Sequence, residues 1–152
     1  MMAPRLLIVA YGNPLRTDDG VAWRAAAVLQ KKFPSEQAEI LTLHQLGPEL
    51  AENASRSECV SFVDAAAGPG RPGEIQVKEL SSGEDTESSA LCHAISPSHV
   101  LALAAQLYHC RPRAYSTTVV GENFNHGESL SPSVEAALPA LLGRIEELST
   151  QR

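Results

Sequence analysis

Short apolar runs alternate along the chain with longer segments in which hydrophobic residues recur every three or four positions. The runs typical of β-strands are residues 5–11, 38–44, 58–65, 73–80 and 114–121. The first and third are almost continuously apolar, as in strands that are covered on both faces of a sheet. The fourth alternates apolar and polar residues, which predicts an edge strand or a half-exposed strand.

Helices are predicted between these strands. From Asp19 onward, apolar residues recur at helical spacing, and a shorter, weaker helix is predicted within 47–57. Two later helices begin with a Ser-Pro pair, at Ser96 and at Ser131, where serine caps a helix and proline fits its first turn. Pro139 is expected to kink or divide the last helix. This order of elements predicts an α/β fold with a twisted, mostly parallel five-stranded sheet sandwiched between helices.

Length and composition favour one small protein domain. The chain has 152 residues, of which 43% are hydrophobic, so we expect a single domain over 1–152, with a mobile serine-rich loop at about 81–95. A net charge of −6 without a basic run argues against nucleic acid or an anionic membrane as a partner. No segment has the pattern of a secretory signal or a membrane span, which predicts a cytoplasmic protein. The three cysteines lack a CxxC spacing and fit reduced thiols.

Candidate chemistry lies at the carboxyl ends of the predicted strands, where ligands bind in open α/β sheets. Asp18 and Asp19 follow the first strand, Asp64 ends the third, and His99 lies in the first turn of the helix after the polar loop. If the first and third strands are neighbours, Asp19 and Asp64 share one rim of the sheet, and His99 can reach it. Two carboxylates and one imidazole are a suitable ligand set for a divalent transition metal.

Each of these residues also has a purely structural interpretation. Acidic residues at a helix N-terminus cap free N–H groups, which is the interpretation we favour for Asp18 and would favour for Asp19 taken alone. Asp64 could close a turn, although an ionisable group that ends a buried strand is costly unless it is paired, capped or bound to a cation. His99 alone would more often be a surface or capping histidine, and His93 competes with it as a ligand. Their coincidence at one rim favours the metal site.

The order of motifs along the chain resembles one known family. The segment GNPLRTDDGVA at 12–22 resembles the N-terminal signature of the hydrogenase maturation endopeptidases. The resemblance continues in VDAAAG at 63–68, AISPSHVLALAAQL at 94–107 and VVGENFNHGESLSPSVEAALPAL at 119–141. These blocks are in family order and together span nearly the whole chain.

This resemblance implies a specific activity. Proteins of the family remove a short C-terminal extension from the large-subunit precursor of nickel–iron hydrogenase after nickel has been inserted. The family's metal-contacting residues correspond to Asp19, Asp64 and His99, so the substrate's nickel is expected to bind there. Asp19 and Asp64 are the expected catalytic residues, because the sequence has no conventional nucleophile motif and hydrolysis would be assisted by the metal or the carboxylates. The expected partner is the precursor, and the oligomeric state is open, with a monomer favoured.

Two other functions fit parts of the pattern. A non-enzymatic nickel-handling or flavodoxin-like binding module could use the loop after the first strand, although its carboxylates would repel a flavin phosphate. A peptidase of the same fold with another protein substrate, such as a spore-protein protease, is the second alternative. The chain length and the later blocks favour the hydrogenase interpretation over both.

Overall fold

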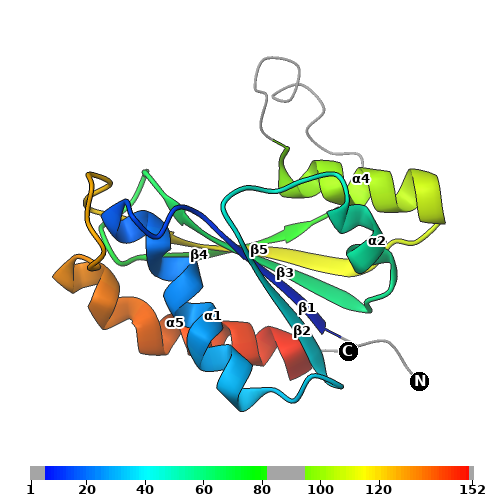
Figure 1. The fold of residues 1–152 in the computed structure, drawn as a ribbon, viewed down its shortest axis with the longest axis horizontal. Helices are drawn as coiled ribbons and strands as arrows, with labels where there is room; N and C mark the ends of the chain where they lie inside the picture. Colours follow the sequence, from blue (N-terminus) through cyan, green and yellow to red (C-terminus); the bar gives the residue numbers. More distant parts are fainter. Residues whose placement is uncertain (1–5, 82–94, 151–152) are drawn as a thin grey trace.

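The computed structural model describes residues 6–81 and 95–150 and contains a five-stranded sheet (Figure 1). The strand order is β2-β1-β3-β5-β4, and only the pairing of β4 with β5 is antiparallel. The strands are β1 (Leu6–Tyr11), β2 (Ala38–Leu43), β3 (Cys59–Ala66), β4 (Ile75–Leu80) and β5 (Arg113–Val120). The predicted mostly parallel five-stranded sheet is therefore confirmed, as is the position of the alternating strand β4 at an edge.

Helices cover both faces of the sheet (Figure 1). They are the 3₁₀-helix η1 (Thr17–Gly20) and the α-helices α1 (Val21–Lys32), α2 (Leu50–Ser55), α4 (Pro97–Tyr108) and α5 (Pro132–Thr150). The first α-helix begins at Val21 and not at Asp19, because the acidic pair lies in η1. Pro139 does not divide the last helix, which continues through it. None of the helices in the described residues is long and apolar enough to cross a membrane.

Two hydrophobic layers hold the helices on the sheet. On one face, Ile8 of β1 and Val63 of β3 pack with residues of α1 and α5. On the other face, Val9 and Phe62 of the same strands pack with residues of α2 and α4. Residues Leu7 to Ala10 of β1 are fully buried, because both faces of this strand are covered. The continuous apolar run of β1 is therefore a strand covered on both faces of the sheet, as the sequence predicted.

The parallel strands place three connections at one rim of the sheet. The chain passes from β1 into η1, from β3 into a glycine-rich turn, and from β5 into the loop 121–131 that precedes α5. These three segments contain most of the polar residues of the sequence motifs, and they lie at the left of Figure 1. The predicted mobile loop falls mainly on residues 82–94, and it lies with His93 outside the described residues.

Candidate active site

A buried carboxylate joins two of the loops at this rim. The side chain of Asp18 in η1 is fully buried. It accepts hydrogen bonds from the backbone N–H groups of Glu122 and Asn123 at 2.7 and 2.9 Å, and from the N–H and hydroxyl of Ser131, each at 2.7 Å. Burial alone would raise the pKa of Asp18, but these hydrogen bonds outweigh it and lower the pKa. Asp18 therefore has a structural role, and it ties the segment after β1 to the loop after β5.

Neighbouring residues strengthen the same connection. The Arg16 Nε donates to the carbonyl of Phe124 at 3.1 Å, and the Thr17 hydroxyl donates to the carbonyl of Asn125 at 2.6 Å. The Thr17 N–H also donates to the carbonyl of Gly127 at 2.8 Å. Thr17 has a φ of 52°, a left-handed conformation that is unfavourable for a β-branched residue and that these bonds hold in place. The two loops form one fixed frame, which we call the rim frame (residues 13–20 and 121–131).

Asp19 is positioned by the turn that follows β1. Its Oδ2 accepts a hydrogen bond from the backbone N–H of Asn13 at 2.7 Å. Gly12 has a φ of 142°, and a Cβ added there would collide with the carbonyl oxygen of Asp19. Only glycine allows this close approach, which explains why the motif has a glycine directly after the strand. Asp19 is half-buried and held at the end of β1.

Asp64 lies near the end of β3 in a half-buried position. Its Oδ1 accepts a hydrogen bond from the N–H of Ala65 at 2.7 Å. Burial, aided by the negative charge of Asp19, raises the pKa of Asp64 from 3.8 to about 7, although hydrogen bonds from Ala65 and the Tyr11 hydroxyl oppose the shift. Burial and the nearby carboxylate of Asp64 raise the pKa of Tyr11. Asp64 thus holds or releases a proton near neutral pH.

Two of the three predicted site residues come together at the rim. β1 and β3 are parallel neighbours, with Ala10 paired to Val63, so that Tyr11 and Asp64 follow at the same level. Asp19, in the segment that continues from β1, is close enough to Asp64 for its charge to affect the Asp64 carboxyl. Tyr11 was not identified from the sequence, although a tyrosine that ends an apolar strand beside a predicted carboxylate was a signal for it.

His99 makes different contacts from those of the two carboxylates. It is the third residue of α4, where its N–H donates to the Ser96 hydroxyl oxygen at 3.3 Å and its Nδ1 accepts from the Ser96 N–H at 3.5 Å. This reciprocal pair is a capping box, the structural alternative that the sequence left open. No group of three or more His, Cys, Asp or Glu residues in segments 6–81 and 95–150 is arranged to hold a metal ion. The structure therefore joins Asp19 with Asp64 but does not join His99 to them.

The carboxylate pair has two chemical capacities. A carboxyl group with a pKa of about 7 can accept and return a proton at neutral pH, as general acid–base catalysis requires. Two carboxylates of neighbouring strand ends can also bind a divalent cation, which would favour the ionised form of both. Either capacity suits hydrolysis of a bond brought to this rim. Two carboxylates would repel a phosphate group, so this rim does not have the features of a phosphate-binding site.

Comparison with known proteins identifies chains that share this fold. No family model matches the sequence, and no curated protein matches it. Among solved structures, the hydrogenase maturating endopeptidase HybD from E. coli is 26% identical, with a TM-score of 0.71 over 95% of this chain and 91% of that one. HybD from Thermococcus kodakarensis, a [NiFe] hydrogenase maturation protease, is 26% identical, with a TM-score of 0.68 over 96% and 99%. HycI from the same organism has a TM-score of 0.77 at 19% identity, over 97% and 93%, and supports the fold.

Proposed function

We propose that this chain, a peptidase of the hydrogenase maturation endopeptidase family, removes the C-terminal extension of a nickel–iron hydrogenase large-subunit precursor after nickel insertion. The observation that carries the proposal is the pairing of Asp19 and Asp64 at the carboxyl ends of adjacent strands. This rim is the place where an open α/β sheet binds its ligand. The full-length similarity to maturation proteases supports the choice of substrate.

Nickel enters this proposal as part of the substrate. Asp19 and Asp64 supply oxygen ligands and His99 supplies a nitrogen ligand, while the precursor supplies the others. Oxygen and imidazole donors bind Ni(II) without the thiolates that would compete for it with the precursor. While the Nδ1 of His99 accepts a hydrogen bond from Ser96, the Nε2 carries the ring proton, so binding of the ion at Nε2 requires that proton to move to Nδ1 and the contact with the Ser96 N–H to break. Recognition of the bound ion would restrict cleavage to precursors that have received nickel.

Hydrolysis in this scheme uses the proton affinity of Asp64. A water molecule attacks the carbonyl carbon of the scissile peptide, the C–N bond breaks, and a proton is transferred to the departing amine. The Asp64 carboxylate lies at the site of attack and can take that proton from water and deliver it to the nitrogen, although a bound nickel ion would lower the pKa of Asp64 below its ion-free value of about 7. The nickel of the precursor, when bound, would polarise the carbonyl group as a Lewis acid.

Mass spectrometry of the precursor tests the proposal directly. Nickel-loaded and nickel-free precursor are incubated with the wild-type protein, with Asp19→Ala and with a control variant, Glu79→Ala. The control removes an exposed carboxylate from the edge strand β4. We expect the wild type and the control to shorten only the loaded precursor, and Asp19→Ala to fold normally and shorten neither. Normal processing by Asp19→Ala, or equal processing of nickel-free precursor, would contradict the scheme.

A second variant in the same assay separates the two roles of His99. Glutamine at the third helical position can replace histidine in a capping box, since its side chain also reaches back to the N-cap amide. His99→Gln should therefore keep the thermal stability of the protein, and it should lose processing if the imidazole binds nickel. Unchanged processing by His99→Gln would restrict His99 to the capping role.

A further inference from the structure

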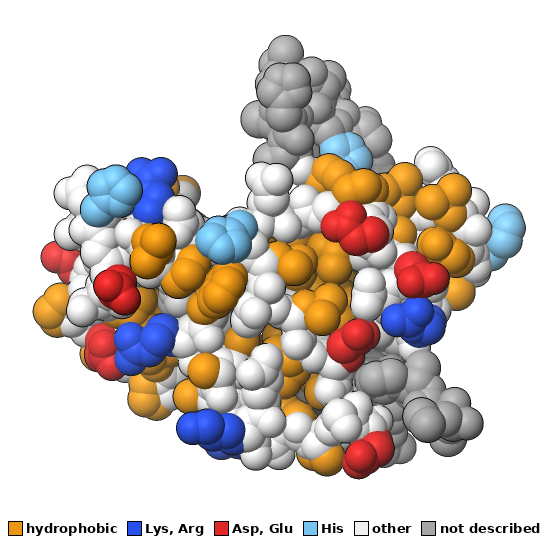
Figure 2. Space-filling model, in the orientation of Figure 1, with side chains coloured by type: hydrophobic (Ala, Val, Ile, Leu, Met, Phe, Trp, Pro, Cys, Tyr) orange, Lys and Arg blue, Asp and Glu red, His pale blue; other side chains and the backbone are white. Residues whose placement is uncertain are grey.

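The two edges of the sheet differ in how they are protected. The outer strand β4 carries exposed charges at Lys78 and Glu79, which discourage another strand from pairing with it. The other outer strand, β2, reads AEILTL and has one charged residue, Glu39, near its start. Half-buried hydrophobic side chains of β2 reach the surface between α1 and α2, across the middle of the face in Figure 2. An apolar edge of this kind is suited to receive a further strand.

The backbone of β2 offers hydrogen-bonding groups on its outer side. The N–H of Gly12 donates to the carbonyl of Leu43 at 3.0 Å. The backbone N–H and C=O groups of the odd-numbered residues of β2 therefore point toward β1. Because backbone groups alternate in direction along a strand, the N–H and C=O of Ile40 and Thr42 point away from the sheet. No segment within residues 6–81 and 95–150 pairs with this side of β2.

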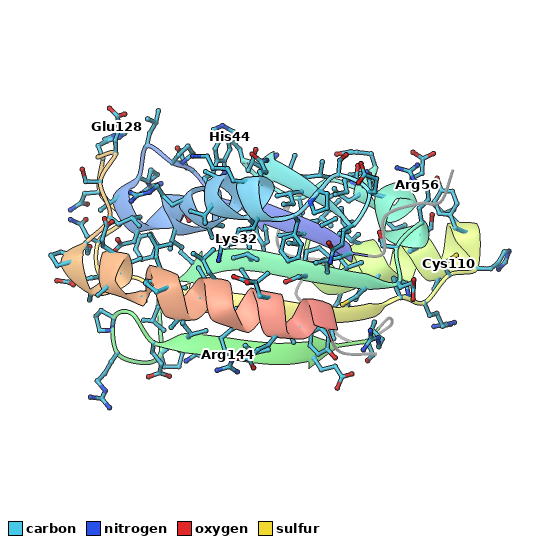
Figure 3. All side chains as sticks on the ribbon, turned by 90° about the horizontal axis from the view of Figure 1, so that it is seen from below. Lys32, His44, Arg56, Cys110, Glu128 and Arg144 are labelled. Atoms are coloured by element: carbon cyan, nitrogen blue, oxygen red, sulfur yellow. The ribbon has the colours of Figure 1, made fainter. Side chains whose placement is uncertain are left out.

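A hollow lies beside the same edge. It has a volume of 460 Å³ and is lined from both faces of the sheet, by Phe33 and Ile40 on the α1 side and by Glu39 and Arg56 on the α2 side. Residues from both faces can line one hollow only where it follows the edge of the strand. His44, which comes directly after β2, and Arg56 lie toward opposite ends of the strand (Figure 3).

We propose that the C-terminal extension of the precursor binds as an added strand along the outer edge of β2. This inference rests on the proposed function, which places the scissile bond at the Asp19–Asp64 rim. The extension then runs from the carboxyl end of β2 toward its start, antiparallel to β2. Its backbone pairs with Ile40 and Thr42, and an apolar side chain enters the hollow beside Phe33. At the far end, Arg56 pairs with Glu52 at 3.4 Å and can also attract the terminal carboxylate of the extension.

The dimensions of the sheet set a minimum length for the extension. Three strand spacings separate β3 from an added strand outside β2, which is roughly 14 Å. An extended chain covers this distance in about four residues. Only residues beyond the fourth can pair with β2, so an extension trimmed to three residues has none of these contacts.

Steady-state kinetics with two precursors tests the inference. Thr42→Pro removes one outward N–H without affecting the β1 ladder, and Glu79→Pro is the matched control at an outward position of β4. For nickel-loaded precursor with its full extension, we expect Thr42→Pro to raise KM about fivefold or more, as loss of a backbone hydrogen bond predicts, with kcat unchanged. With the extension trimmed to three residues, both variants should match the wild type.

The outcomes separate this inference from the proposed function. If the wild type cleaves the precursor and Thr42→Pro has an unchanged KM, the strand model is wrong while the proposed function stands. If the wild type cleaves no nickel-loaded precursor, both fail. A dimer in sedimentation that Thr42→Pro dissociates would assign the edge to a second copy of the chain and overturn the model. Should Thr42→Pro not fold, hydrogen exchange on Asp19→Ala decides: the model requires added precursor to protect the amides of Ile40 and Thr42.

Discussion

Replacement of Asp64 by asparagine should stabilise the protein, and the gain should grow with pH. The pKa of Asp64 is about 7 in the folded protein against an ordinary value of 3.8. Between these values the folded state binds a proton that the unfolded state has released, so stability falls as pH rises. The destabilisation is absent well below pH 4 and reaches its full value above pH 7. Asparagine has nearly the same shape and no charge, so Asp64→Asn removes this dependence.

The size of the effect follows from the two pKa values. Integration of the difference in bound protons gives a loss of about 2 to 3 kcal/mol for the wild type between pH 5 and pH 8. The free energy of unfolding of Asp64→Asn, measured relative to the wild type, should rise by this amount over the same range. The mechanism is desolvation, because burial is the main cause of the raised pKa of Asp64.

Urea unfolding followed by circular dichroism at pH 5, 6.5 and 8 measures the difference. Asp18→Asn is the control of opposite sign, because the pKa of Asp18 is lowered in the folded state. The stability that Asp18 provides is fully present above its ordinary pKa of 3.8 and is lost only as pH falls through its lower folded pKa, so this variant should be destabilised by the same amount at all three pH values. If the Asp64→Asn difference is constant with pH, or shrinks as pH rises, the burial argument is refuted.

Two other substitutions test buried polar groups. Asp18→Ala leaves the amides of Glu122, Asn123 and Ser131 without their acceptor, and we expect a loss of about 3 to 5 kcal/mol in chemical denaturation, with faster hydrogen exchange in 121–131. Thr117→Val should instead stabilise by about 1 to 2 kcal/mol, measured by calorimetry, since the fully buried Thr117 hydroxyl has no hydrogen-bond partner in the described residues.

The fold could be predicted because its signals are local. The run at β1 is apolar at every position since both faces of the strand are buried, and β4 alternates since it is an edge. The start of α1 was placed two residues too early, because acidic residues at 18 and 19 fit a 3₁₀ turn as well as a first helical turn. Local patterns do not distinguish these two geometries.

The candidate site was predictable only where strand order determines it. Adjacent parallel strands bring Asp19 and Asp64 to one rim, so knowledge of strand ends was enough for that pair. The partners of Asp18 lie 104 to 113 residues away in the sequence, and no local pattern indicates such contacts. For His99 both interpretations were open, and the capping contact with Ser96 is the one that the structure contains.

The way the rim frame is fastened bears on how such peptidases could diversify. Three of the four hydrogen bonds to Asp18 come from main-chain amides, and Arg16 and Thr17 donate to main-chain carbonyls. The segment 121–131 is thus anchored almost independently of which amino acids it contains. Mutations can therefore change its outward surface while its anchorage persists. Antibody loops similarly vary in sequence while a constant framework holds them in position.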